Sequence, residues 1–170
     1  GSDTDKISVL IRKGEVLQVM GQWLECRAVL EQSLHLARSL DRQSEMAVVL
    51  RMTGVLEARC GSPIKALGHL NQALDLFEHL EDPDGRADVM VNLGNICYLT
   101  GDYHQARTYF QQALDHFLVT RNVRAFAGAA NNMGMTYRWT GDLEKAREYY
   151  EQTLKIGREA GDKHAIALAT

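Results

Sequence analysis

The chain has 170 residues, of which 45% are hydrophobic and 24% are charged, a composition typical of one globular domain. Its formal net charge of −3 and its scattered Lys and Arg residues exclude a general nucleic-acid binder, which needs a basic patch or stripe. All apolar runs are shorter than a bilayer-spanning segment, so we expect no membrane association.

A period of 40 residues runs through the sequence. Two series of glycines repeat at this spacing, each followed at fixed distances by a small and then a large apolar residue. Such self-similarity predicts one array over residues 1–170, with repeats at 3–42, 43–82, 83–122 and 123–162 and a partial repeat at 163–170. The matching positions are Gly14, Gly54, Gly94 and Gly134; Gly21, Gly61, Gly101 and Gly141; Cys26, Ala66, Ala106 and Ala146; and Leu30, Leu70, Phe110 and Tyr150.

Each repeat is predicted to form two helices. In the second repeat they run from about Ser44 to Arg59 and from about Pro63 to Leu80. Apolar residues follow the three-and-four spacing of a helix face, as at Val89, Leu93 and Ile96. No segment alternates like a strand, so the fold class is all-α.

A glycine followed by a capping residue explains the break inside each repeat. Gly141 can take the left-handed conformation that ends a helix, and Asp142 can cap the next one. We expect the same role for Ser62 before Pro63, for Asp102 with Gln105, and more weakly for Gln22 with Glu25. Because the pair recurs at every corner and follows no strand, it is not a phosphate-binding loop.

The mid-helix glycines have a different explanation. Gly54, Gly94 and Gly134 each carry a helix-propensity cost of about 0.5–1 kcal/mol relative to Ala. A cost repeated at one position implies a repeated close approach of the partner helix. We expect the small residue of that helix to face each glycine, namely Ala66, Ala106 and Ala146.

The chain resembles the tetratricopeptide repeat family, on Leu93-Gly94-x-x-Cys97 and Met133-Gly134-x-x-Tyr137 followed by Ala106-x-x-x-Phe110 and Ala146-x-x-x-Tyr150. Its period is 40 rather than 34 residues. The proline near the end of the second helix is missing, and Lys13 and Glu57 occupy apolar positions. The resemblance implies a right-handed superhelical α-solenoid of antiparallel helix pairs, with first helices lining a concave groove that receives a peptide or helix. Long repeats of this kind look like those of polarity scaffolds that regulate G proteins, of sensor regions in bacterial transcription activators, and of peptide-pheromone receptors.

The resemblance also implies which residues line the groove, at fixed offsets along each first helix. In the family, a chaperone-tail carboxylate is held by Lys, Asn and Arg at two of these offsets, where this chain has only Arg51 as a cation. The clamp is therefore absent, and we expect a ligand segment with apolar anchors and acidic character, contacted by Arg51 and Arg138. The predicted groove residues are Arg51, Val55, Val91, Asn95, Tyr98, Asn131, Met135 and Arg138.

Structural roles compete with these assignments. Asn92, Asn95 and Asn132 could instead tie adjacent repeats together, and Trp139 could pack on the next helix. The aromatic residues Trp23, Tyr103, Tyr109, Phe117 and Tyr149 are expected in the core or between repeats.

Catalytic and metal sites are not indicated. The six histidines fall at different repeat positions, and no His-x-x-x-His spacing exists. Cys26, Cys60 and Cys97 replace small or apolar residues, so we expect all three in the core. Without a CxxC pair they indicate a reducing compartment and a cytoplasmic protein. We expect no enzyme, no cofactor and no metal.

The sequence favours a non-catalytic scaffold or adaptor that binds a protein or peptide ligand. The alternative is a ligand- or peptide-sensing module of a larger signalling or transcription-regulator protein. A third hypothesis is an assembly module. The stretch 161–167 resembles the start of another repeat, and a severed array would expose an apolar face for self-association through the C-terminal end.

Overall fold

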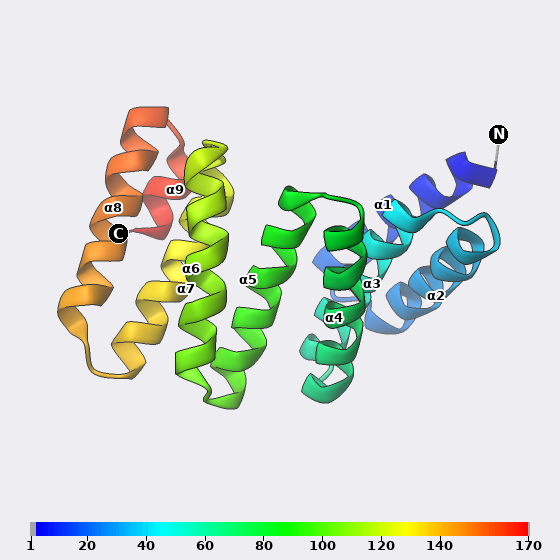
Figure 1. Cartoon of the computed structure of the whole chain (residues 1–170), viewed down its shortest axis with the longest axis horizontal. Helices are drawn as coiled ribbons and strands as arrows, with labels where there is room; N and C mark the ends of the chain where they lie inside the picture. The colour runs from blue at the N-terminus through cyan, green and yellow to red at the C-terminus, as the bar shows by residue number, and fades with distance from the viewer. Residues whose placement is uncertain (1–2, 170) are drawn as a thin grey trace. The chain divides into compact units, whose positions relative to one another are not determined.

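A computed structural model describes residues 3–169, and this part of the chain contains nine α-helices and no strand (Figure 1). The all-α class is confirmed, and the two helices predicted in the second repeat begin and end within one residue of their expected limits. Residues 1–2 and 170, at the ends of the expected array, lie outside the described residues. The helices are α1 Asp3–Val19, α2 Trp23–Ser39, α3 Gln43–Arg59, α4 Pro63–His79, α5 Pro83–Thr100, α6 Tyr103–Val119, α7 Val123–Trp139, α8 Leu143–Ala160 and α9 Lys163–Leu168.

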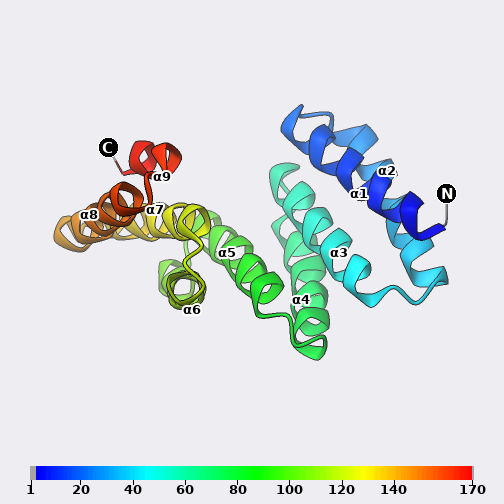
Figure 2. The same ribbon diagram turned by 90° about the horizontal axis from the view of Figure 1, so that it is seen from above.

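The chain divides into two compact units, Gly1–Val89 and Met90–Thr170, and α5 contributes residues to both. In the first unit α1 packs on α2, α2 on α3, and α3 on α4, and the paired helices lie side by side in Figures 1 and 2. In the second unit α6 packs on α7, α7 on α8, and α8 on α9. Within each unit, these helices therefore bury apolar residues against one another.

The corner inside each full repeat has a left-handed glycine, as predicted, and two of the four predicted caps form. Gly141 adopts a φ of 84° after α7, and Asp142 caps α8 by accepting a hydrogen bond of 3.2 Å from the Lys145 N–H. Asp102 caps α6 in the same way, at 3.0 Å from the Gln105 nitrogen. The caps predicted for Ser62 and Gln22 are wrong, because neither side chain makes a capping hydrogen bond.

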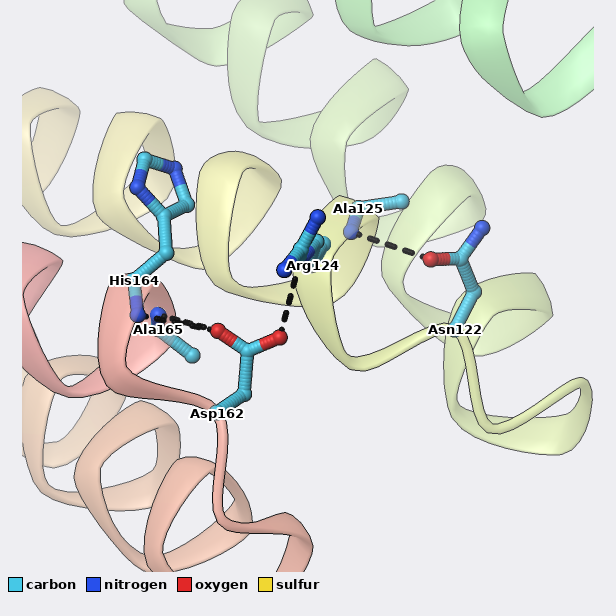
Figure 3. A network of polar contacts seen from close by, with 6 residues as sticks. All are labelled: Asn122, Arg124, Ala125, Asp162, His164 and Ala165. Carbon is cyan, nitrogen blue, oxygen red and sulfur yellow. Dashed lines mark hydrogen bonds and ion pairs between the residues drawn. The ribbon is translucent and has the colours of Figure 1, made fainter.

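Three of the turns between repeats are made by a left-handed residue other than glycine, which the sequence did not predict. Asp41, Glu81 and Arg121 take φ values of 50–54°, the left-handed region that usually favours glycine. The following helix can then start on a side-chain cap, as at Asn122 after Arg121 (Figure 3). Asp162 also caps its helix, but it follows a left-handed glycine, Gly161.

The mid-helix glycines face large side chains rather than small ones. A Cβ atom at Gly94 would lie 2.6 Å from Phe110 Cε1, and one at Gly134 would lie 2.6 Å from Tyr150 Cε1. The expected close approach of the partner helix is confirmed, and at Gly54 it includes Ala66, whose carbonyl oxygen would lie 3.2 Å from the added Cβ. At Gly94 and Gly134 the nearest atoms belong to the large residue and not to Ala106 or Ala146. The bulky residue one helical turn further along fills the space that the missing side chain leaves.

Buried apolar residues form the core of each unit. In the first unit Leu17, Cys26 and Leu56 belong to one cluster, and in the second Phe110 and Phe117 are buried, as predicted for Phe117. The prediction that all three cysteines are buried is wrong, because Cys60 is exposed at the end of α3 and Cys97 is only partly covered.

Candidate peptide-binding surface

Six of the eight predicted groove residues lie in the second unit, on two first helices. Spacings of four and three residues place the members of each helix on one face, and all are partly buried except Arg138, which is exposed. We call this set the α5–α7 surface; it consists of Val91, Asn95 and Tyr98 on α5 and Asn131, Met135 and Arg138 on α7.

A side-chain hydrogen bond joins the two helices of this surface. Asn132 Nδ2 donates to Asn95 Oδ1 at 2.8 Å. The alternative that these two residues tie adjacent repeats together is therefore confirmed. The bond uses the carbonyl oxygen of Asn95 but not its NH₂ group, which can donate to a ligand carbonyl.

A second amide is held more weakly. Asn131 Nδ2 contacts Met135 Sδ at 3.6 Å, and a thioether sulfur is a poor acceptor. Both residues are half-buried on α7. A peptide backbone that offered a carbonyl oxygen would be a stronger partner for this amide than the sulfur is.

Aromatic side chains flank the amides. Tyr98 packs edge-on against Tyr103, with ring centroids 5.8 Å apart, which fixes its orientation. Trp139 follows Arg138 at the end of α7 and is 65% exposed. The alternative that Trp139 packs on the next helix is therefore wrong, and the indole is available for contact.

The remaining two predicted residues, Arg51 and Val55, lie half-buried on α3 in the first unit. Arg51 Nη2 is 3.9 Å from Asp88 Oδ2, a carboxylate of the same unit. The positive charge of Arg51 is thus partly balanced within the protein, which the sequence did not predict. Arg138 is the more accessible of the two cations proposed to contact an acidic ligand.

Sequence reasoning missed a polar and aromatic cluster between α6 and α8. Tyr137 and Tyr149 are stacked with ring centroids 5.7 Å apart, and Arg107 lies 5.1 Å from the centre of the Tyr137 ring. A pattern in the sequence could have indicated this cluster. Arg107 and Tyr137 are 30 residues apart, the same separation as between Arg27 and Glu57 in the earlier repeats.

The described residues offer neither a metal site nor a membrane span. Across residues 3–169, His, Cys, Asp and Glu side chains do not gather in threes at distances suited to a metal ion. The helices in this range are either too short or too polar to traverse a bilayer.

The repeat pattern can now be compared with known families. The model of the tetratricopeptide repeat matches residues 5–79, 45–118 and 126–170. The chain belongs to the tetratricopeptide repeat family. Tetratricopeptide repeats are generally a non-catalytic fold for protein interaction.

Solved structures of other tetratricopeptide repeat proteins share the fold. A Rap protein complexed with Competence and Sporulation Factor is 23% identical, with a TM-score of 0.92 over 99% of this chain and 47% of that one. Aspartyl phosphate phosphatase F from Bacillus subtilis is 16% identical, with a TM-score of 0.90 over 99% of this chain and 44% of that one. A signal transduction ATPase from Pyrococcus horikoshii with a tetratricopeptide repeat sensor is 20% identical, with a TM-score of 0.82 over 95% and 25%.

The chain spans about half the length of the first two of these structures. At these identities the similarity shows the fold alone. No curated protein sequence matches the chain.

Proposed function

We propose that this tetratricopeptide repeat protein is a non-catalytic interaction module that captures a peptide segment of another protein on the α5–α7 surface. The observation that carries the proposal is the Asn95–Asn132 hydrogen bond with Asn131 beside it. This arrangement presents amide donors and acceptors along two helices. Amides of this kind can pair with both the N–H and the C=O groups of an extended backbone.

The side chains around the amides suggest what the segment contains. Val91 and Met135 supply half-buried apolar area, and Tyr98 supplies an oriented ring. Arg138 and Trp139 are exposed at the end of α7, and Arg, Trp and Tyr are the residues that most often anchor interfaces. A ligand with apolar anchors and an acidic residue near Arg138 fits this composition.

The Rap structure lends support from outside the chain. That protein was solved with Competence and Sporulation Factor bound, so a closely similar fold accommodates a bound factor.

The test is affinity for a synthetic peptide identified by pull-down from the source organism. Tyr98→Ala and Arg138→Ala should each weaken binding by roughly tenfold, because a truncated anchor costs more than about 1 kcal/mol. Their melting temperatures should stay close to that of the wild type. Arg158→Ala, at an exposed arginine of α8, is the matched control. Full affinity in both test variants would show that the ligand binds elsewhere.

The division into two units favours a second candidate, a sensing module of a larger regulatory protein. Because α5 contributes to both units, a ligand that contacts α5 could change the relation between them. Small-angle scattering tests this idea. A change in radius of gyration on adding an effector supports sensing, and a constant radius across effectors contradicts it.

Self-association through the C-terminal end stays a prediction. Within the described residues, α9 packs on α7 and α8. Light scattering at increasing concentration tests it, because a self-associating chain gains apparent mass and a monomer does not.

A further inference from the structure

A hollow in the second unit is lined by residues of α6, α7 and α8, and none of the residues of the α5–α7 surface lines it. It has a volume of about 280 Å³ beside Tyr149, and it adjoins a second space of about 580 Å³. The two spaces share Leu118 and Phe126 in their walls. We call them the polar end and the apolar end of the α6–α8 hollow.

Two consecutive hydrogen bonds link three side chains in the wall of the polar end. The Tyr149 hydroxyl donates to Gln111 Oε1 at 2.9 Å, and Gln111 Nε2 donates to Asp115 Oδ1 at 2.8 Å. The chain therefore ends on a carboxylate, which can accept further hydrogen bonds. Glu148 places a second carboxylate in the same wall.

Carboxylates outnumber cations in the wall of the polar end, and Arg107, which is not a wall residue, lies 5.1 Å from the centre of the Tyr137 ring. Lys145 also lines the polar end, but Lys145 Nζ lies 3.6 Å from Asp142 Oδ2 and 5.3 Å from the centre of the Tyr137 ring. The ion pairs found within residues 3–169 include neither Asp115 nor Glu148.

The electrostatic environment of Tyr149 agrees with this imbalance. Burial raises the pKa of Tyr149, and Tyr137, Asp115 and Glu148 raise it further. A negative field beside an aromatic ring favours a cation with several N–H donors, such as a guanidinium or an ammonium group.

The apolar end adjoins these carboxylates closely. Leu118 stands three residues after Asp115 on α6, so the two side chains lie one helical turn apart on the same face. Phe117, Phe126 and Ile156 add apolar side chains to the wall, and Leu118 is 52% exposed. The rest of the wall consists of Val123 and Ala160 and of the oppositely charged Arg121 and Glu159. An occupant therefore meets a carboxylate and an apolar surface within a few ångströms of each other.

The aromatic residues at the polar end do not both recur in the earlier repeats. Eighty residues before Tyr137 and Tyr149 stand Glu57 and His69, and forty residues before them stand Cys97 and Tyr109. Glu57 forms an ion pair with Arg27 instead of a ring contact. The stacked ring pair beside two carboxylates is thus particular to the last two full repeats. This distinguishes it from contacts that merely hold neighbouring repeats together.

We propose that the α6–α8 hollow binds a segment of a partner protein in which an arginine or lysine stands next to a large apolar residue. The basic side chain enters the polar end, between the Tyr149 ring and the carboxylates of Asp115 and Glu148. The apolar side chain covers Leu118 and Phe126. The chain would then have two separate binding surfaces, one on first helices and one between second helices.

The experiment uses blocked dipeptides titrated into the full chain labelled with ¹⁵N. The probes are acetyl-Leu-Arg-amide, acetyl-Leu-Lys-amide and acetyl-Leu-citrulline-amide, the last an uncharged analogue of arginine. We expect saturable shifts of the Gln111 and Gln152 side-chain amides with the Arg and Lys probes. Affinity for the citrulline probe should be lower by on the order of fivefold, which is the size of one partly exposed charge contact.

Two variants test whether the carboxylates of Asp115 and Glu148 contact the basic side chain of the probe. Asp115→Asn and Glu148→Gln should each weaken the Arg probe by a few-fold while the fold is kept, because both substitutions are nearly isosteric. Asp75→Asn is the matched control, since Asp75 is exposed at the equivalent position of α4, one repeat earlier. It should leave the affinity unchanged.

Three results would overturn the proposal. The first is equal binding of the citrulline probe, and the second is equal binding by Asp115→Asn, Glu148→Gln and wild type. The third is binding of free guanidinium as tight as that of acetyl-Leu-Arg-amide, because it would indicate a small-cation site that makes no use of the apolar end.

Discussion

Arg27 and Glu57, thirty residues apart, form an ion pair that joins α2 to α3 across the boundary between the first two repeats. The Glu57 side chain is only 4% exposed, whereas that of Arg27 is 36% exposed. Arg107 and Tyr137 occupy the same two positions two repeats later, where the contact is a cation over a ring. The same two positions of the repeat thus form an ion pair in one place and a cation–ring contact in the other. Because the Glu57 carboxylate is buried, loss of its partner should destabilise the fold more than loss of Arg107.

Removal of Arg27 should destabilise the first unit. In Arg27→Ala the Glu57 carboxylate stays buried without its main partner, so the free energy of unfolding should fall by about 1–3 kcal/mol. Arg107→Ala is the matched control and should cost less than about 1 kcal/mol, because it leaves no buried charge behind. Urea unfolding of the two variants measures both values. Equal losses would contradict the special role of Glu57.

Acid should weaken the fold through Glu57. The hydrogen bond from Arg27 holds the pKa of Glu57 below its ordinary value, although burial opposes the shift. A carboxyl with a lowered folded-state pKa contributes stability that is fully present above its unfolded pKa of about 4.3. That contribution is lost as the pH falls through the lower folded pKa. Unfolding free energies measured from pH 6 to pH 3 should therefore decrease less steeply in Glu57→Gln than in wild type.

A methyl group should have opposite effects at two glycines of the second unit. Gly94→Ala should cost about 1–3 kcal/mol, because the new Cβ would lie 2.6 Å from the Phe110 ring. Gly128→Ala should stabilise by about 0.5–1 kcal/mol, because no atom lies within 4 Å of the new Cβ and alanine favours the helix. Thermal unfolding of the two variants gives the sign of each change. A stabilising Gly94→Ala would show that the ring moves aside at little cost.

The capping hydrogen bonds of Asp162 and its ion pair with Arg124 can be tested separately. Asp162 accepts hydrogen bonds from the His164 and Ala165 N–H groups and from Arg124 Nε of α7 (Figure 3). Asp162→Ala removes both kinds of contact and should destabilise α9 by about 0.5–2 kcal/mol. Asp162→Asn retains the cap and should lose less than about 1 kcal/mol, since Arg124 is 77% exposed. Amide hydrogen exchange in α9 reports the difference, and equal exchange in the two variants would assign the whole effect to the ion pair.

Some local features of the fold could be predicted from the sequence. The left-handed turn at Gly141 and the cap at Asp142 depend on steric limits and hydrogen bonds within four residues of chain. The left-handed conformation of Arg121 could not be predicted in this way, because a residue with a side chain takes it only when the helices on both sides hold it there.

The candidate site was predictable only in part. The repeat spacing placed Asn95 and Asn131 on the same side of consecutive first helices, but it did not show that Asn132 would bond to Asn95. Nor did it show that Asp88 would approach Arg51. Side chains choose their partners from whatever the neighbouring helix presents, and the sequence does not show which rotamers bring them together.

By itself, the sequence determined the helix pairs, their limits and their family, because a 40-residue period with glycine corners restricts each segment through local sterics and apolar spacing. Tertiary structure decided what meets across the pairs: Phe110 against Gly94, Arg27 against Glu57, and the stacked rings beside the α6–α8 hollow. Such contacts depend on the rotation and separation of helices from different parts of the chain. Packing energy summed over both helices sets that geometry, and no short stretch of sequence contains it.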